Sequence, residues 1–275
     1  MEKQKKKMVL QITNLLTPIF ATLLISFSGV DAMNVFQDTA TKILSPAGFT
    51  FAIWGPIFLF QALFYFYQAR DIFKPFEEKI SMPYVHDVNV FFLLSWLSTA
   101  AWYILWGGGY VWPGVAAMFA YLLTSLGAYL RLGINLRERS LREHIFVTVG
   151  WSMLCGWITV AAIVNTSSAL VLSGFSAAPI GEVGWTIIVL VIALVIYLLV
   201  LFTRNDFVFS SVGVWALIGV LASLLSPLTT FYFEIVLVTA LGIIILALSM
   251  IFWVTYKIRK GDFFILKKIS GNKTE

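Results

Sequence analysis

Charged side chains are scarce in this chain. Only 12% of its 275 residues are Asp, Glu, Lys or Arg, while 60% are hydrophobic. A soluble domain carries roughly 25% charged residues, so there is too little polar material here to cover a soluble surface. The charges are also segregated and leave apolar stretches of about 20 residues, the length of a helix that crosses a bilayer. Because a membrane β-barrel would show alternating apolar residues, we predict an all-α, polytopic transmembrane helix bundle.

Cysteine and the common catalytic motifs are also lacking. The single cysteine, Cys155, lies in an apolar run and excludes a disulfide framework or a CxxC metal site within the chain. There is no HExxH, P-loop or GxSxG motif, and no charge near the middle of an apolar stretch. A membrane hydrolase and a carrier with a proton relay inside the bilayer are therefore disfavoured. We expect no metal site and no required cofactor, and an enzyme stays a less favoured alternative.

The apolar stretches predict about eight transmembrane helices. Their expected bounds are residues 8–29, 47–69, 88–107, 111–131, 144–166, 184–203, 207–225 and 231–256. The first run follows four lysines, but it is too long for a signal peptide, so we interpret it as a retained helix. The triplet 204–206 (RND) predicts a charged tight turn. Gly55-Pro56 is expected to kink the second helix, because proline removes a backbone donor.

The basic residues predict the orientation. With the N-terminus placed inside, every Lys and Arg except Lys42 falls on the inner side of the eight spans. Such an asymmetry favours cytosolic N- and C-termini in an integral membrane protein, with the bacterial plasma membrane as the expected location. The net charge of +5 then reflects topology, so nucleic acid is not an expected partner and the lipid bilayer is.

Aromatic residues are abundant, with 10 Trp, 24 Phe and 10 Tyr. Trp106, Trp112, Trp185 and Trp253 lie near predicted helix ends, where interfacial anchors are expected. Other aromatic and polar residues recur at helical spacing within the second, third and fifth spans. These candidate ligand-binding residues are Phe51, Trp54, Phe58, Thr99, Trp102, Trp157, Ala161 and Asn165. If the faces converge they form an apolar pocket with a few polar groups; the alternative is ordinary helix packing.

Two segments resemble signatures of the TspO/translocator-protein family. Residues 45–58 (SPAGFTFAIWGPIF) resemble its second-helix signature, and residues 156–165 (GWITVAAIVN) resemble its fifth-helix signature. Trp102 stands where the family has a third-helix tryptophan. The longer group called tryptophan-rich sensory proteins is the more similar one, since residues 204–206 (RND) followed by 214–219 (VWALIG) resemble its additional C-terminal helices.

The resemblance implies a division of the chain and a site. Residues 1–166 would form a five-helix membrane domain, 167–183 an outer loop, 184–256 three additional helices and 257–275 a basic cytosolic tail. The pocket would lie between helices 2, 3 and 5 under a lid formed by residues 30–46. Family members bind porphyrins, haem among them, and sterols, and many form homodimers. Thr99 departs from the asparagine that the family often has there, and Met153-Leu154 replace its usual Pro-Tyr pair.

Four functions are compatible with this pattern. The favoured one is a membrane sensor or regulator that binds a hydrophobic tetrapyrrole-like or sterol-like ligand. A transporter of such a ligand is second, because alternating access usually accompanies internal repeats, which this sequence lacks. An enzyme acting on a bound tetrapyrrole and a structural or assembly subunit are the others.

Overall fold

A computed structural model describes residues 2–30, 44–227 and 229–260. Seven helical segments in this part of the chain are long and apolar enough to cross a membrane, and the shorter Phe91–Gly107 is apolar as well. The main helices are α1 (Glu2–Phe27), α2 (Trp54–Ala69), α4 (Phe91–Gly107), α5 (Val111–Leu132), α7 (Val149–Leu172), α8 (Gly181–Arg204), α9 (Phe207–Leu224) and α10 (Phe233–Arg259). The short elements are η2 (Gly48–Ile53), η3 (Phe76–Glu78), α3 (Pro83–Val88), α6 (Leu141–Glu143) and η4 (His144–Thr148). The described residues form no strand, so the predicted all-α membrane bundle is confirmed.

Each predicted span has its helix, with shifted bounds. The first helix begins at Glu2, because the lysines before the apolar run are good helix formers and continue it. The fifth predicted span continues to Leu172, so the loop before α8 is shorter than the expected 167–183. The kink expected at Gly55-Pro56 takes another form: the backbone changes from the 3-10 helix η2 to α-helix at Trp54. Pro56 then lies in the first turn of α2, a part of a helix that tolerates proline.

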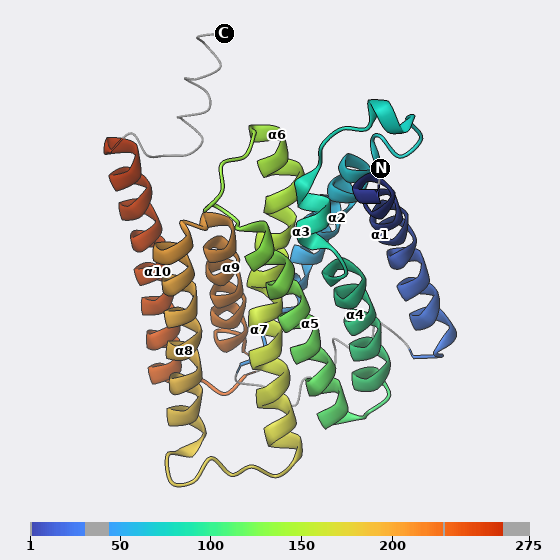
Figure 1. The fold of residues 1–275 in the computed structure, drawn as a ribbon. Coiled ribbons are helices and arrows are strands. Elements are labelled where there is room, and N and C mark those ends of the chain that lie inside the picture. The colour runs from blue at the N-terminus through green and yellow to red at the C-terminus, as the bar shows by residue number, and fades with distance from the viewer. Residues whose placement is uncertain (1, 31–43, 228, 261–275) are drawn as a thin grey trace.

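The helices run side by side, with α10 and α8 on one flank and α1 on the other (Figure 1). The first residues of α1 and the last residues of α10 lie at the same end of the bundle. We call this end, which also holds α6 and the turn between α8 and α9, the basic end. An even number of crossings follows from this arrangement. Helix α7 packs against α2, α5 and α9, and α9 joins α8 and α10 to the rest.

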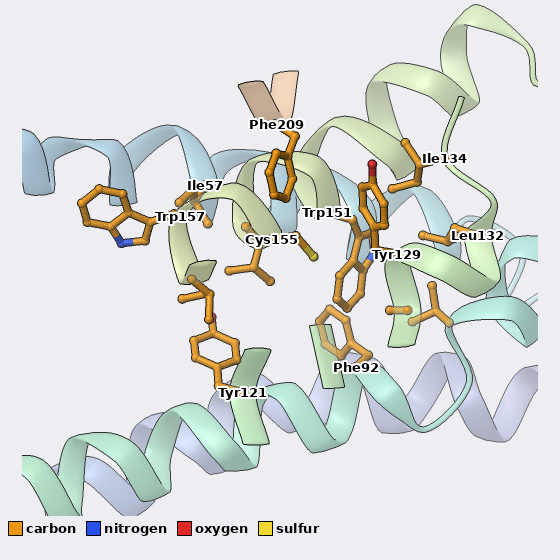
Figure 2. Packing of buried hydrophobic residues seen from close by; sticks show 14 of the residues in the cluster. Ile57, Phe92, Tyr121, Tyr129, Leu132, Ile134, Trp151, Cys155, Trp157 and Phe209 are labelled. Atoms are coloured by element: carbon orange, nitrogen blue, oxygen red, sulfur yellow. The ribbon is translucent and has the colours of Figure 1, made fainter. Parts of the chain in front are cut away.

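The main core surrounds α7. Trp151 is 1% exposed and packs edge-on against Phe64 and Phe92. Figure 2 shows Trp157 at one end of this cluster and Leu132 and Ile134 at the other, with Trp151 and Phe92 between them. A second cluster belongs mainly to the C-terminal helices; its buried members are Leu44, Leu190, Leu217, Val220, Leu224 and Ile235.

The turn between α8 and α9 is built on a buried carboxylate. Asp206 is 0% exposed, although a charged triplet in a turn suggests a solvated position. One carboxylate oxygen caps α9 by accepting from the N–H of Phe209 at 2.9 Å. The other accepts from Tyr129 Oη at 2.8 Å and Ser152 Oγ at 2.7 Å. Burial raises the pKa of the Asp206 carboxyl, and these bonds to α5 and α7 tie the C-terminal helices to the core.

Candidate ligand-binding site

A hollow lies between α2, α4, α5 and α7. It encloses about 580 Å³, including the part that is open to the surroundings. We call it the aromatic pocket; the described residues that line it are Pro46, Phe51, Trp54, Trp102, Trp106, Met118, Tyr121, Trp157, Ile158, Val160, Ala161, Val164 and Asn165. The structure therefore brings together six of the eight predicted candidates.

Three tryptophan and phenylalanine rings form one wall. The Phe51 ring meets the Trp157 ring edge-on at 5.8 Å, and the Trp54 ring meets the same indole edge-on at 6.3 Å. Such edge-to-face pairs fix the ring planes and contribute about 0.5–1.5 kcal/mol each beyond burial. The change from η2 to α2 at Trp54 sets the direction of Phe51 and Trp54. This wall therefore presents flat aromatic surface in a defined geometry.

Two predicted ligand-binding residues bind each other. Trp102 Nε1 donates to Asn165 Oδ1 at 2.7 Å, which joins α4 to α7 across the pocket. Asn165 Nδ2 donates to the carbonyl of Ala161 at 3.0 Å. The side-chain amide keeps one N–H and one oxygen lone pair beyond these bonds. Asn165 is thus held in place by the protein, with reduced capacity for a ligand.

Trp54 supplies an unpaired donor. Its indole Nε1 is buried and has no hydrogen-bond partner among the described residues. An unpaired buried N–H is unfavourable by roughly 1–3 kcal/mol, so an acceptor atom at this point gains more than an ordinary hydrogen bond gives. The remaining lining is almost entirely apolar. The pocket thus matches an apolar ligand that carries at least one acceptor.

Charge and metal ligands are absent from the described lining. None of the described lining residues is Asp, Glu, Lys, Arg or His. No group of three or more His, Cys, Asp or Glu that could hold a metal occurs in the part of the chain that the structure describes. Of the residue types that bind haem iron, Met118 and Tyr121 are present. No lysine or arginine is among the described lining residues to pair with the propionates of haem, so the lining fits a neutral ligand better than haem.

Comparison with known protein families supports the resemblance that the sequence motifs indicated. A family model described as "TSPO-like protein" matches residues 8–253, from α1 into α10. The chain belongs to the TSPO-like protein family. No curated protein and no solved structure matches it. Since the match continues through α8, α9 and most of α10, the C-terminal helices are part of what defines this TSPO-like chain.

Two predicted residues lie outside the aromatic pocket. Phe58 is 45% exposed, and its ring stacks on the Trp54 ring with 5.3 Å between the ring centroids. Phe58 therefore packs against a pocket residue without lining the pocket itself. Thr99 is buried and donates to the carbonyl of Ser95 at 2.8 Å, and its side chain interacts with that of Tyr121. Of the predicted lid, residues 31–43 lie outside the described part of the chain, while Pro46 lines the pocket.

Sequence reasoning missed several lining residues. Met118 and Tyr121 come from α5, a helix that the resemblance did not place at the site. Their spacing on α5 is a signal that could have suggested a shared face. Trp106 was assigned to the interfacial belt, and its position one turn beyond Trp102 on the same face of α4 accounts for its place in the pocket.

A polar seam between α1 and α2 was also missed. Its buried members are Lys7, Gln11, Asn14, Gln61, Gln68 and Asp71. Lys7 Nζ donates to Asp71 Oδ2 at 2.6 Å, and Gln11 Nε2 donates to Asp71 Oδ1 at 2.9 Å. The spacing i, i+4, i+7 of the three polar residues on α1 indicates a shared face and was the available signal. The seam begins at the basic end and is separate from the aromatic pocket, since none of its residues lines that pocket.

Proposed function

We propose that this TSPO-like membrane protein is a sensor or regulator that binds a flat hydrophobic molecule in the aromatic pocket. The observation that carries the proposal is the aromatic pocket, an almost entirely apolar hollow that brings six of the eight candidate residues together. Trp54, one of these residues, has a buried indole N–H without a partner among the described residues, which would favour a ligand that brings an acceptor. In the proposed orientation, the basic end faces the cytosol and the pocket lies towards the opposite side.

The ligand class follows from the lining. We propose a neutral polycyclic molecule with a hydroxyl, carbonyl or imine acceptor, for which a sterol is the closest of the expected classes. A porphyrin has the right flat shape and imine-type ring nitrogens as acceptors, and we propose it as the second class. Its carboxylates would have to remain outside the described lining, because no cation lies there.

The test is a fluorescence titration of the detergent-purified protein with cholesterol, protoporphyrin IX and haem. We expect saturable tryptophan quenching by at least one of the three. Trp54→Phe keeps most of the ring and removes the N–H, so it should weaken binding about tenfold if the donor pairs with the ligand. Trp54→Ala with Trp157→Ala removes the wall and should abolish saturation.

The matched control is Trp253→Phe, which removes an indole N–H at the basic end, where it donates to Asn205 Oδ1. Binding by Trp253→Phe should equal that of the wild type. Unchanged binding by the Trp54 and Trp157 variants would place the ligand elsewhere and refute the proposed site. If none of the three molecules binds, the sensor proposal loses these ligand classes and a scaffold role gains support.

Transport of the same ligand is the alternative. One observation favours it: the helix that supplies Phe51 and Trp54 is interrupted by the change from η2 to α2 beside the pocket. Discontinuous helices at a site are common in transporters. Ligand flux into proteoliposomes that exceeds the flux into protein-free liposomes, and that Trp54→Ala abolishes, would establish transport rather than sensing.

A further inference from the structure

Residues 44–53, which we call the hinge segment, face two parts of the protein. Pro46 and Phe51 line the aromatic pocket. Leu44 is 6% exposed and belongs instead to the buried cluster of the C-terminal helices. The same short piece of backbone therefore contributes to the pocket wall and to the core of α8, α9 and α10.

Helix α9 holds the hinge segment through three polar and aromatic contacts. The N–H of Ala47 donates to the carbonyl of Gly219 at 2.9 Å. Trp215 Nε1 donates to the carbonyl of Thr50 at 2.8 Å, and the Trp215 ring meets the Phe49 ring edge-on at 5.6 Å. The Ala47 N–H precedes η2 and finds its acceptor on α9, so the segment depends on α9 for part of its position.

Close approach at Gly219 makes this docking possible. A Cβ atom built at residue 219 would lie 2.6 Å from Thr50 Cγ2 and 2.9 Å from Thr50 Cβ, closer than real Cβ contacts. Thr50 is 0% exposed, and its hydroxyl has no partner among the described residues. Any side chain at position 219 must therefore push the hinge segment away from α9.

From these contacts we infer that α9 positions the pocket wall, and that occupancy of the pocket and the seating of the hinge segment on α9 are coupled. Trp215 and Gly219 are the positioning residues. A ligand that displaces Pro46 or Phe51 moves the backbone that α9 holds, and a change in α9 moves the wall that the ligand touches. The coupling is reciprocal, because a binding equilibrium linked to a conformational one shifts both by the same factor. The C-terminal helices would thereby sense the pocket, an inference that rests on the proposed function only for its ligand-binding measurement.

The first measurement needs no ligand. Amide hydrogen exchange of residues 44–53 in the purified full-length protein reports directly on the Ala47 N–H. Gly219→Ala and Trp215→Phe should accelerate exchange in this segment, whereas Thr50→Val, which removes an unpaired hydroxyl at similar shape, should leave it unchanged or slower. The controls are Gly242→Ala on α10, where a Cβ would meet Leu217 Cδ1 at an ordinary 3.5 Å, and Trp253→Phe. Both should exchange as the wild type does.

The second measurement fills the pocket from within. Ala161→Leu adds volume to the lining without touching α9, and its effect on the exchange of residues 44–53 replaces that of a ligand. We expect altered exchange of the segment in this variant. Ala161→Val serves as a smaller change if Ala161→Leu does not fold. Wild-type exchange in folded pocket-filling variants would overturn the coupling.

The third measurement separates this inference from the proposed function. Protoporphyrin IX titrations of Gly219→Ala should show affinity changed by about fivefold or more, while Gly242→Ala binds as the wild type. Suppose that Trp54→Ala loses binding, while Gly219→Ala binds as the wild type even though hydrogen exchange shows that its hinge segment is released. This result would refute the coupling and leave the proposed function standing. If protoporphyrin IX does not bind the wild type, that ligand fails, and the exchange of the pocket-filling variants decides the coupling alone.

Discussion

Single buried polar side chains are of two kinds in this protein. Asp206 and the Lys7–Asp71 pair have hydrogen bonds for their charged atoms, and they join helices that are distant in sequence. Trp54 Nε1 and Thr50 Oγ1 have no partner among the described residues. These two are among several such atoms, and both belong to the stretch that enters α2, beside the pocket. Trp151 Nε1 is likewise unpaired within the core, so we interpret the Trp54 donor as a ligand contact only together with the position of Trp54 in the pocket lining.

The Lys7–Asp71 pair gives a prediction for stability. Lys7 is 2% and Asp71 0% exposed, so removing one partner leaves a buried charge without compensation. We expect Lys7→Met or Asp71→Asn alone to destabilise the protein by about 3–5 kcal/mol, and the double variant to recover much of that loss. The measurement is the unfolding free energy in detergent micelles. Lys6→Met, at an exposed position on the same helix, is the control and should be neutral. Equal, additive losses in the single and double variants would contradict a coupled pair.

The same pair predicts a dependence on pH. Burial on its own raises the pKa of the Asp71 carboxyl, but hydrogen bonds from Lys7, Gln11 and the N–H of Ile80, with the charge of Lys7, hold it below the ordinary value of 3.8. A carboxyl with a lowered folded-state pKa stabilises fully above its unfolded pKa, and this stability is lost as the pH falls through the folded-state pKa. Asp71→Asn should therefore flatten the acid side of the stability profile below pH 3.8.

Among the C-terminal helices, α9 has the most connections. It packs against α7, α8, α10 and η2, and its glycines let it approach α8 and η2 closely. Tyr197 of α8 illustrates this: its ring lies over Gly213 of α9, while its hydroxyl donates to the carbonyl of Gly156 in α7 at 2.8 Å. One side chain thus joins three helices at a point where a glycine leaves space.

A pair of glycine substitutions tests this joint. A Cβ at Gly213 would lie 2.6 Å from Tyr197 Cγ, whereas a Cβ at Gly242 has only an ordinary contact. Gly213→Ala should destabilise the protein by about 1–3 kcal/mol, because the Tyr197 ring must move. Gly242→Ala should be neutral or slightly stabilising, since alanine is the better helix former. Thermal unfolding in micelles measures both, and equal melting temperatures for the two variants would contradict the close packing of α8 on α9.

At the scale of the whole molecule, the directions of the helices and the positions of the charges are both consistent with an even number of membrane spans. The start of α1 and the end of α10 lie at one end of the bundle (Figure 1), as an even number of spans requires. That end carries an ion-pair network in which Asp87 Oδ2 lies 2.9 Å from an Arg137 nitrogen and 3.7 Å from an Arg139 nitrogen. The surface of the bundle between the two ends is largely apolar, as expected for contact with lipid.

Orientation is testable by reporter fusion. The basic end should face the cytosol, because positive residues are retained on that side during insertion. A fluorescent protein that matures only in the cytosol should therefore fluoresce when fused after Glu275. The same reporter inserted after Gly174, in the loop between α7 and α8 at the opposite end, should stay dark. Fluorescence from the Gly174 insertion and none from the C-terminal fusion would reverse the orientation.

The sequence by itself determined the class, the number of spans and the family. Length, apolarity and the positions of the basic residues are local properties, and a helix in lipid satisfies its own backbone, so these features needed no knowledge of neighbours. Spacing along one helix also grouped Phe51 with Trp54 and Trp157 with Asn165, because a single helix fixes which residues share a face.

Only the tertiary structure decided how those faces meet. That Trp102 binds Asn165, that α5 contributes Tyr121, and that Asp206 is buried are facts about separate helices brought together. The contact between Gly219 and the hinge segment is of the same kind: a glycine in a helix shows where close approach is permitted, but not which partner approaches. Without a hydrophobic driving force between helices in lipid, partner choice rests on such shape and hydrogen-bond complementarity, which one-dimensional periodicity does not contain.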